Sequence, residues 1–188
     1  MVQFDAAYCF GSYEGPLREF IHLFKYGGVK TLAGPLSQLL LQVLPLEERF
    51  VVVMAVPMHW RKRWLRGFNQ AELLAKPVAR RIGVPLCQNL RRKRYTRAQA
   101  SLSKAQRRQN PVHTFAVRRP EQIQGKRVLL IDDVFTTGAT LRAAAAALKE
   151  AGAGHVAVLT LARVDRREAA AELPLSHDVT PKAAGVIS

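Results

Sequence analysis

Apolar residues along the first third of the chain alternate between strand-like and helix-like spacing. Residues 2–10 alternate loosely, which predicts an edge strand. A helix is predicted next by one apolar face, formed by Leu17, Phe20, Ile21 and Phe24. The spacing then predicts a second helix over 31–44 and a buried strand over 50–56, which is rich in β-branched residues. Asn69 should cap a further helix that runs to about residue 82, and Pro77 should kink or divide it.

The remaining pattern predicts a parallel sheet. A short strand is expected over 86–90, followed by a long basic loop over 91–104, a short helix to residue 110 and a strand over 114–117. Two further strands, over 126–131 and 155–161, flank an alanine-rich helix over 138–151. Strand–helix–strand order with tight glycine turns is typical of α/β proteins with parallel strands. Residues 164–188 contain few bulky apolar side chains, and we expect a flexible C-terminal tail there.

Composition bears on the location of the protein and on whether it has a structural metal site. No apolar run approaches the roughly 20 residues of a membrane-spanning helix, and the N-terminus has no basic segment followed by an apolar one. We therefore expect no membrane insertion and a cytoplasmic location. The two cysteines, Cys9 and Cys87, do not form the paired spacing of a structural zinc site, so no residue is assigned directly as a metal ligand.

Positive charge is concentrated in one quarter of the chain. The net charge is +15, and residues 61–108 hold 15 Lys and Arg against the single acid Glu72. The rest of the chain is nearly neutral. A solvated surface usually mixes both signs, so this concentration indicates a polyanionic ligand such as pyrophosphate, a nucleotide or nucleic acid.

The stretch RVLLIDDVFTTGATLRAAAAAL, which begins at Arg127, predicts a phosphate-binding turn between a strand and a helix. Backbone N–H groups at a helix N-terminus favour an anion, and Gly138 lets the backbone approach it closely. Asp132 and Asp133 can accept hydrogen bonds from vicinal ribose hydroxyls. The predicted ligand is therefore a ribose 5′-phosphate, and its phosphate would contact Thr136, Thr137, Gly138, Ala139 and Thr140.

Residues 128–141, VLLIDDVFTTGATL, resemble the phosphoribosyl pyrophosphate (PRPP) motif of type I phosphoribosyltransferases. The stretches YEGPLREFIHLFKYGG, VPMHWRKRWLRGFNQAELLA and QASLSKAQRRQN extend the resemblance, over residues 8–163, to the competence-associated ComF family. This resemblance implies an α/β type I phosphoribosyltransferase fold with a central, mainly parallel sheet flanked by helices. It also implies a small hood-like region at 1–45 and a phosphoribosyltransferase core at 46–163.

Two departures limit what the ComF resemblance carries over. Members of that family commonly begin with a Cys-rich, zinc-ribbon-like segment, which does not occur in this sequence. The chain is then either a short form or one that starts late. The tail after Arg163 also extends beyond the family pattern.

The resemblance assigns roles to the basic segments. The loop after the 50–56 strand would bind pyrophosphate through Arg61, Lys62, Arg63 and Arg66. A flexible loop that closes over PRPP would contribute Arg94, Gln99 and Arg107. The catalytic residues would be Asp132, Asp133 and Arg94. The cofactor would be Mg²⁺, held through PRPP and by Asp132 or Asp133.

Three functions compete at this point. We favour a phosphoribosyltransferase that uses PRPP and Mg²⁺ and releases pyrophosphate, linked to competence and DNA uptake or to nucleotide metabolism. The alternative is a non-catalytic protein of the same fold that binds single-stranded DNA during natural transformation, with Trp60 and Trp64 as stacking residues. The third is an interaction protein of the competence machinery. The acceptor substrate and the oligomeric state are left open.

Overall fold

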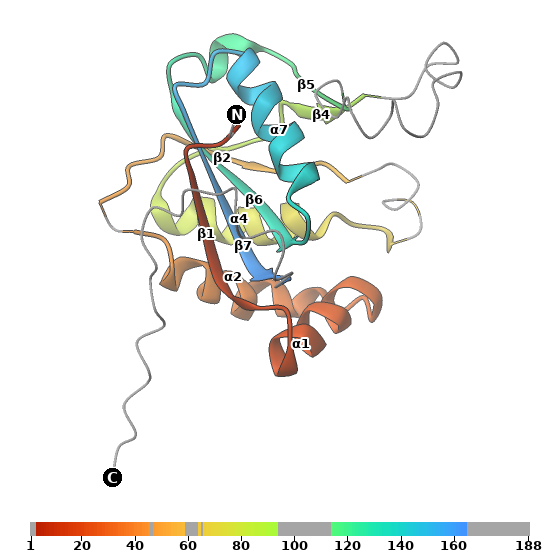
Figure 1. Cartoon of the computed structure of the whole chain (residues 1–188). Helices are drawn as coiled ribbons and strands as arrows, with labels where there is room; N and C mark the ends of the chain where they lie inside the picture. The colour runs from red at the N-terminus through yellow and green to blue at the C-terminus, as the bar shows by residue number, and fades with distance from the viewer. Residues whose placement is uncertain (1–2, 46, 59–63, 65, 94–113, 165–188) are drawn as a thin grey trace.

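The computed structural model describes residues 3–45, 47–58, 64, 66–93 and 114–164. Within them, five strands form one sheet in the order β1-β7-β6-β2-β3, and every pairing in it is parallel (Figure 1). The strands are β1 (Ala6–Ser12), β2 (Val52–Ala55), β3 (Leu86–Cys87), β6 (Arg127–Phe135) and β7 (His155–Arg163). A mainly parallel sheet flanked by helices, predicted from the sequence, is confirmed.

Helices cover both faces of the sheet (Figure 1). One face packs against α1 (Gly15–Tyr26), α2 (Ala33–Gln42) and α4 (Gln70–Ile82), and the other against α7 (Ala139–Glu150). Side chains of β6 alternate between these two cores: Leu129 and Ile131 join the α1 side, whereas Val128 and Leu130 join the α7 side. The central strand is therefore apolar on both faces.

The region around residue 90 differs from the prediction. Instead of one strand over 86–90, β3 belongs to the central sheet, while β4 (Leu90–Arg92) pairs with β5 (Phe115–Val117) in a separate antiparallel sheet. The predicted loop from residue 91 therefore begins with strand residues. Leu90 and Phe115 are buried in the α7-side core, and this packing explains why so polar a stretch starts as a strand. The predicted short helix to residue 110 lies outside the described residues.

Three smaller differences from the predictions concern α4, β6 and α1. Pro77 does not divide α4, which is one continuous helix. The helix is held in place by buried residues that precede and follow Pro77, namely Leu74, Ala75, Val78 and Ala79. Strand β6 continues to Phe135, so that Asp132 and Asp133 lie within the strand. On α1, Ile21 and Phe24 are buried as predicted, whereas Phe20 is exposed.

The N-terminal region contributes to both the sheet and the site. Strand β1 is an edge strand that pairs with β7, as predicted for residues 2–10 although shifted along the chain, and α2 packs on α4. Helix α1 follows the carboxyl end of β1 (Figure 1). The domain division at residue 45 stays a prediction, as does the tail at 164–188, of which only Val164 is described. Among the described residues, no helix has the length and apolar character needed to cross a bilayer.

Candidate functional site

The two predicted ligand-binding segments leave neighbouring strands of the sheet. Strands β2 and β6 are parallel and adjacent, with Ala55 opposite Ile131, and the Val56 N–H donates to the Ile131 carbonyl at 2.9 Å. The loop after Val56 and the segment beginning at Asp132 therefore start side by side at the carboxyl edge of the sheet. Ligands of open α/β sheets bind at this edge.

A tight turn joins β6 to α7. Gly138 occupies the N-cap of α7 with φ 72°, in the left-handed region that glycine adopts without strain. A Cβ at this position would lie 2.7 Å from Cζ of Phe135 and 2.8 Å from Nη1 of Arg142. Nη2 of Arg142 donates to the Thr137 carbonyl at 2.7 Å. The turn is thus fixed from both sides, and its exposed residues Thr136, Thr137, Ala139 and Thr140 precede or begin a helix.

Asp132 and Asp133 experience different environments although they are adjacent. Burial, followed by the neighbouring Asp133 carboxylate, raises the pKa of Asp132 well above its usual range. The Asp133 N–H donates to Oδ1 of Asp132 at 2.9 Å, and the charges of Lys25 and Arg92 oppose the rise. Oδ1 of Asp133 lies 3.1 Å from Nζ of Lys25 on α1.

Helix α1 is anchored on the segment that follows the basic loop. The ring centroids of Phe24 and Phe68 are 6.0 Å apart, and the guanidinium of Arg66 lies 4.6 Å from the centroid of Tyr26. Asn69 caps α4 as predicted, accepting from the Ala71 N–H at 3.2 Å. Its side-chain amide also donates to the Val56 carbonyl at 3.1 Å. The loop between Val56 and Asn69 therefore has its two ends tied together.

The structure brings together part of the predicted site. Asp132, Asp133 and the turn from Thr136 to Thr140 lie at the end of β6. Arg66, in the segment that follows β2, lies over the ring of Tyr26 on α1. Arg61, Lys62, Arg63, Arg94, Gln99 and Arg107 lie outside the described residues. The assignment of each residue to PRPP, pyrophosphate or catalysis stays a prediction.

Three cations that sequence reasoning missed belong to this edge of the sheet: Lys25, Arg92 and Arg142. Lys25 contacts Asp133, Arg92 acts on Asp132, and Arg142 holds Thr137. A signal existed for Arg142, since it lies one helical turn after Gly138 in the motif itself. The ion pair of Lys25 depends on the packing of α1 against β6, which no local pattern encodes.

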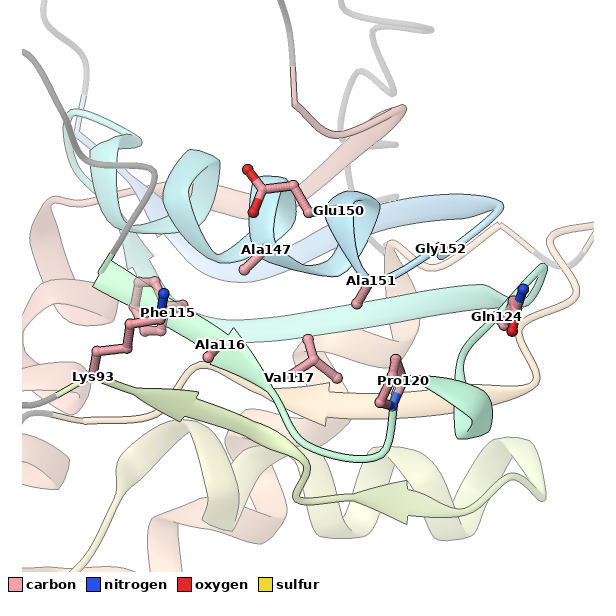
Figure 2. Close-up of a pocket in the computed structure, with 10 residues that line it drawn as sticks. All are labelled: Lys93, Phe115, Ala116, Val117, Pro120, Gln124, Ala147, Glu150, Ala151 and Gly152. Carbon is pink, nitrogen blue, oxygen red and sulfur yellow. The ribbon is translucent and has the colours of Figure 1, made fainter.

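A separate groove of about 510 Å³ is lined by neither Asp132 nor Asp133 (Figure 2). It runs between β5 and the C-terminal half of α7, with Phe115, Val117 and Ala147 among its apolar walls and Lys93, Gln124 and Glu150 at its polar positions. The part of α7 that lines this groove is its C-terminal half, whereas the Gly138 turn lies at the N-terminus of the helix.

Comparisons with known proteins define the class. Residues 69–181 match the family described as phosphoribosyl transferase domain. The DNA utilization protein YhgH of Salmonella typhi is 36% identical over 161 residues, which cover 80% of this chain and 69% of that protein. Competence protein F of Haemophilus influenzae is 31% identical over 167 residues, or 85% and 73% of the two chains. Among solved structures, glutamine PRPP amidotransferase from B. subtilis is 27% identical, with a TM-score of 0.47 over 70% of this chain and 25% of that one.

The parallel sheet, the turn at the end of β6 and the family match together define a protein with a phosphoribosyltransferase-type domain. More narrowly, the chain belongs to the ComF family of competence and DNA-utilization proteins. The family and the type I phosphoribosyltransferase fold expected from the sequence are both confirmed.

Proposed function

We propose that this protein binds PRPP with Mg²⁺ and transfers its phosphoribosyl group to an acceptor, with release of pyrophosphate. One observation carries the proposal: a carboxylate pair and a glycine turn at a helix N-terminus lie at the end of β6, directly beside the β2 end that leads into the basic loop. In this proposal the two acids bind the diol of PRPP, the turn binds its 5′-phosphate, and the basic loop binds its pyrophosphate. The family match to a phosphoribosyl transferase domain supports it.

Phosphoribosyl transfer requires the chain to hold the ribose, to hold the 5′-phosphate and to compensate the charge of the leaving pyrophosphate. Asp132 and Asp133 hold the ribose by its hydroxyls, and backbone N–H groups of the turn hold the 5′-phosphate. Breaking the bond from C1′ to pyrophosphate develops positive charge on the ribose and negative charge on the leaving group. Arg66, and the predicted Arg61, Lys62, Arg63 and Arg94, supply positive charge for the departing pyrophosphate. The protein thereby acts by orientation and charge compensation.

The acidic pair fits Mg²⁺ only together with the ligand. Two carboxylates are present, and among the described residues no group of three or more His, Cys, Asp or Glu side chains is placed to hold a metal. Mg²⁺ is commonly bound by one or two carboxylates plus substrate phosphates. Asp132 or Asp133 would hold it, and the ion would neutralise the pyrophosphate charge.

Release of pyrophosphate from PRPP tests the catalytic proposal. Purified protein is mixed with PRPP, Mg²⁺ and a panel of nucleobases and amines, and pyrophosphate is measured over time. We expect release with at least one acceptor and none from an Asp132→Ala/Asp133→Ala variant, which controls for contaminating activity. If no acceptor supports release while PRPP still binds, the protein is a PRPP-binding protein and not a transferase.

Single-strand DNA binding is the second candidate. Trp64 is 82% exposed within the basic quarter of the chain, and Tyr26, also exposed, lies under Arg66. Exposed aromatic side chains among cations suit stacking with bases. Relatives carry the names competence protein F and DNA utilization protein. Binding of an oligonucleotide should weaken steeply with salt and with Trp64→Ala, and an affinity independent of both would exclude this candidate.

A further inference from the structure

Lys25 forms a sheltered ion pair with one acid of the phosphoribosyltransferase motif. Its Nζ lies 3.1 Å from Oδ1 of Asp133, and the two side chains are 16% and 14% exposed. Exposed ion pairs contribute little to stability, whereas removing one partner of a sheltered pair leaves an uncompensated charge. The contact therefore constrains the Asp133 carboxylate and is more than a surface encounter.

The backbone at Lys25 is held in place from the other side. Nε2 of Gln70 donates to the Lys25 carbonyl at 3.4 Å, and Gln70 is only 1% exposed. Phe24, the preceding residue, is buried and packs against Phe68. Gln70 begins α4, so the end of α1 is fastened to the segment that follows the basic loop. Lys25 thus connects the β2 side of the site to the β6 side.

We propose that Lys25 is a positioning residue of the ribose subsite, one that fixes Asp133 and compensates its charge beside Asp132 so that both acids accept hydrogen bonds from a vicinal diol. This inference rests on the proposed function. It gives helix α1 a role in holding the donor sugar.

Electrostatics around the acidic pair supports this role. Burial and Asp133 raise the pKa of Asp132, while Lys25 on α1 and Arg92 on β4 oppose the rise. An ionised carboxylate offers about four acceptor sites, so Asp133 can accept from Lys25 and from a ribose hydroxyl at the same time.

The test measures PRPP affinity by calorimetry with Mg²⁺ at a single neutral pH. We expect Lys25→Met to weaken binding about tenfold, because Asp133 loses the ion pair that fixes it. Lys25→Arg keeps the charge and should recover most of the affinity. Lys76→Met removes an equivalent charge from an exposed position on α4 and should match the wild type.

A second ligand pair separates positioning from general damage to the fold. Ribose 5-phosphate and 2-deoxyribose 5-phosphate differ by one hydroxyl. If Lys25 acts through the acids that bind the diol, Lys25→Met should weaken ribose 5-phosphate more than the deoxy sugar. A purely structural role would weaken both equally.

The outcomes distinguish the two proposals. If the wild type binds PRPP but Lys25→Met matches Lys76→Met in PRPP affinity, the role of Lys25 is overturned and the proposed function stands. Equal losses in Lys25→Met and Lys25→Arg, or equal weakening of the two sugar phosphates by Lys25→Met, also overturn it. If the wild type does not bind PRPP, both proposals fail. Should Lys25→Met not fold, Gln70→Leu, which releases the Lys25 carbonyl, must weaken PRPP binding severalfold, and an unchanged affinity contradicts the inference.

Discussion

The two edges of the central sheet use the same kinds of side chain in opposite ways. At the amino edge, Glu48 accepts from Tyr8 at 3.2 Å and pairs with Arg127, and Asp5 pairs with Lys149 at 2.7 Å while accepting from the Val156 N–H. At the carboxyl edge, two acids lie side by side and Lys25 contacts one of them.

Electrostatics separates the edges further. Hydrogen bonds from Lys149 and Val156 lower the pKa of Asp5 against the effect of its burial, whereas burial and a like charge raise that of Asp132. At the amino edge, Asp5 and Glu48 are each paired with a cation of the fold. The carboxyl edge retains an unfavourable charge arrangement that a ligand with donor hydroxyls and a metal ion would relieve. The two edges therefore differ in how their acids are compensated: each acid of the amino edge is paired with a cation, whereas Asp132 keeps a like charge beside it.

Gly138 should give the largest effect at the carboxyl edge. Gly138→Ala puts a side chain on a residue with φ 72° and within 3 Å of Phe135 and Arg142. We expect a loss of about 2 kcal/mol in unfolding free energy and a loss of PRPP binding greater than tenfold. Urea unfolding and calorimetry measure both.

Gly34→Ala is the matched control for this substitution. Gly34 lies within α2, and an added Cβ there meets nothing within 4 Å. Its variant should be as stable as the wild type or slightly more so. Equal stability of the two alanine variants would show that the turn at Gly138 is not constrained as described.

The unfavourable charge of Asp132 should make the stability of the wild type depend on pH. Its pKa is higher in the folded protein than in the unfolded chain. The unfolding free energy of the wild type is therefore highest at acidic pH, where Asp132 is protonated in both states, and it falls as pH rises through the raised pKa. Asp132→Asn removes the charge. Its unfolding free energy relative to the wild type should therefore rise between pH 6 and pH 9, on the order of 1 kcal/mol.

Glu150→Gln, at an exposed position of α7, serves as the control for the pH series. Its stability relative to the wild type should stay flat over the same range. A relative stability of Asp132→Asn that falls with pH would mean that Asp132 is stabilised by its ion pairs, like the acids of the amino edge.

Glu48 should show the smallest effect, and only on stability. Glu48→Gln removes the charge that Arg127 and Tyr8 share at the amino edge, and we expect a loss of about 1 kcal/mol because the pair is partly exposed. PRPP affinity should stay within twofold of the wild type. A substantial loss of affinity would show that the two edges are coupled and would remove the distinction between them.

The sequence predicted the β6 end of the site more completely than its surroundings. Strand, acids, turn and helix follow one another within residues 127–150, so local patterns suffice there. The division of residues 86–92 between two sheets depends on the pairing of β4 with β5, which begins 25 positions after β4 begins. The pairing of Lys25 with Asp133 likewise depends on tertiary packing. Periodicity does not reveal contacts between distant parts of the chain, which is why Lys25 and Arg92 were missed.

Calorimetric titration of PRPP with Mg²⁺ into the wild type and into Asp132→Ala/Asp133→Ala is the most direct test of the carboxyl edge as a PRPP site. We predict saturable binding to the wild type and a reduction of at least a hundredfold in the double variant, which should still unfold cooperatively. Equal affinity of the two proteins, or no binding by the folded wild type, would contradict the account.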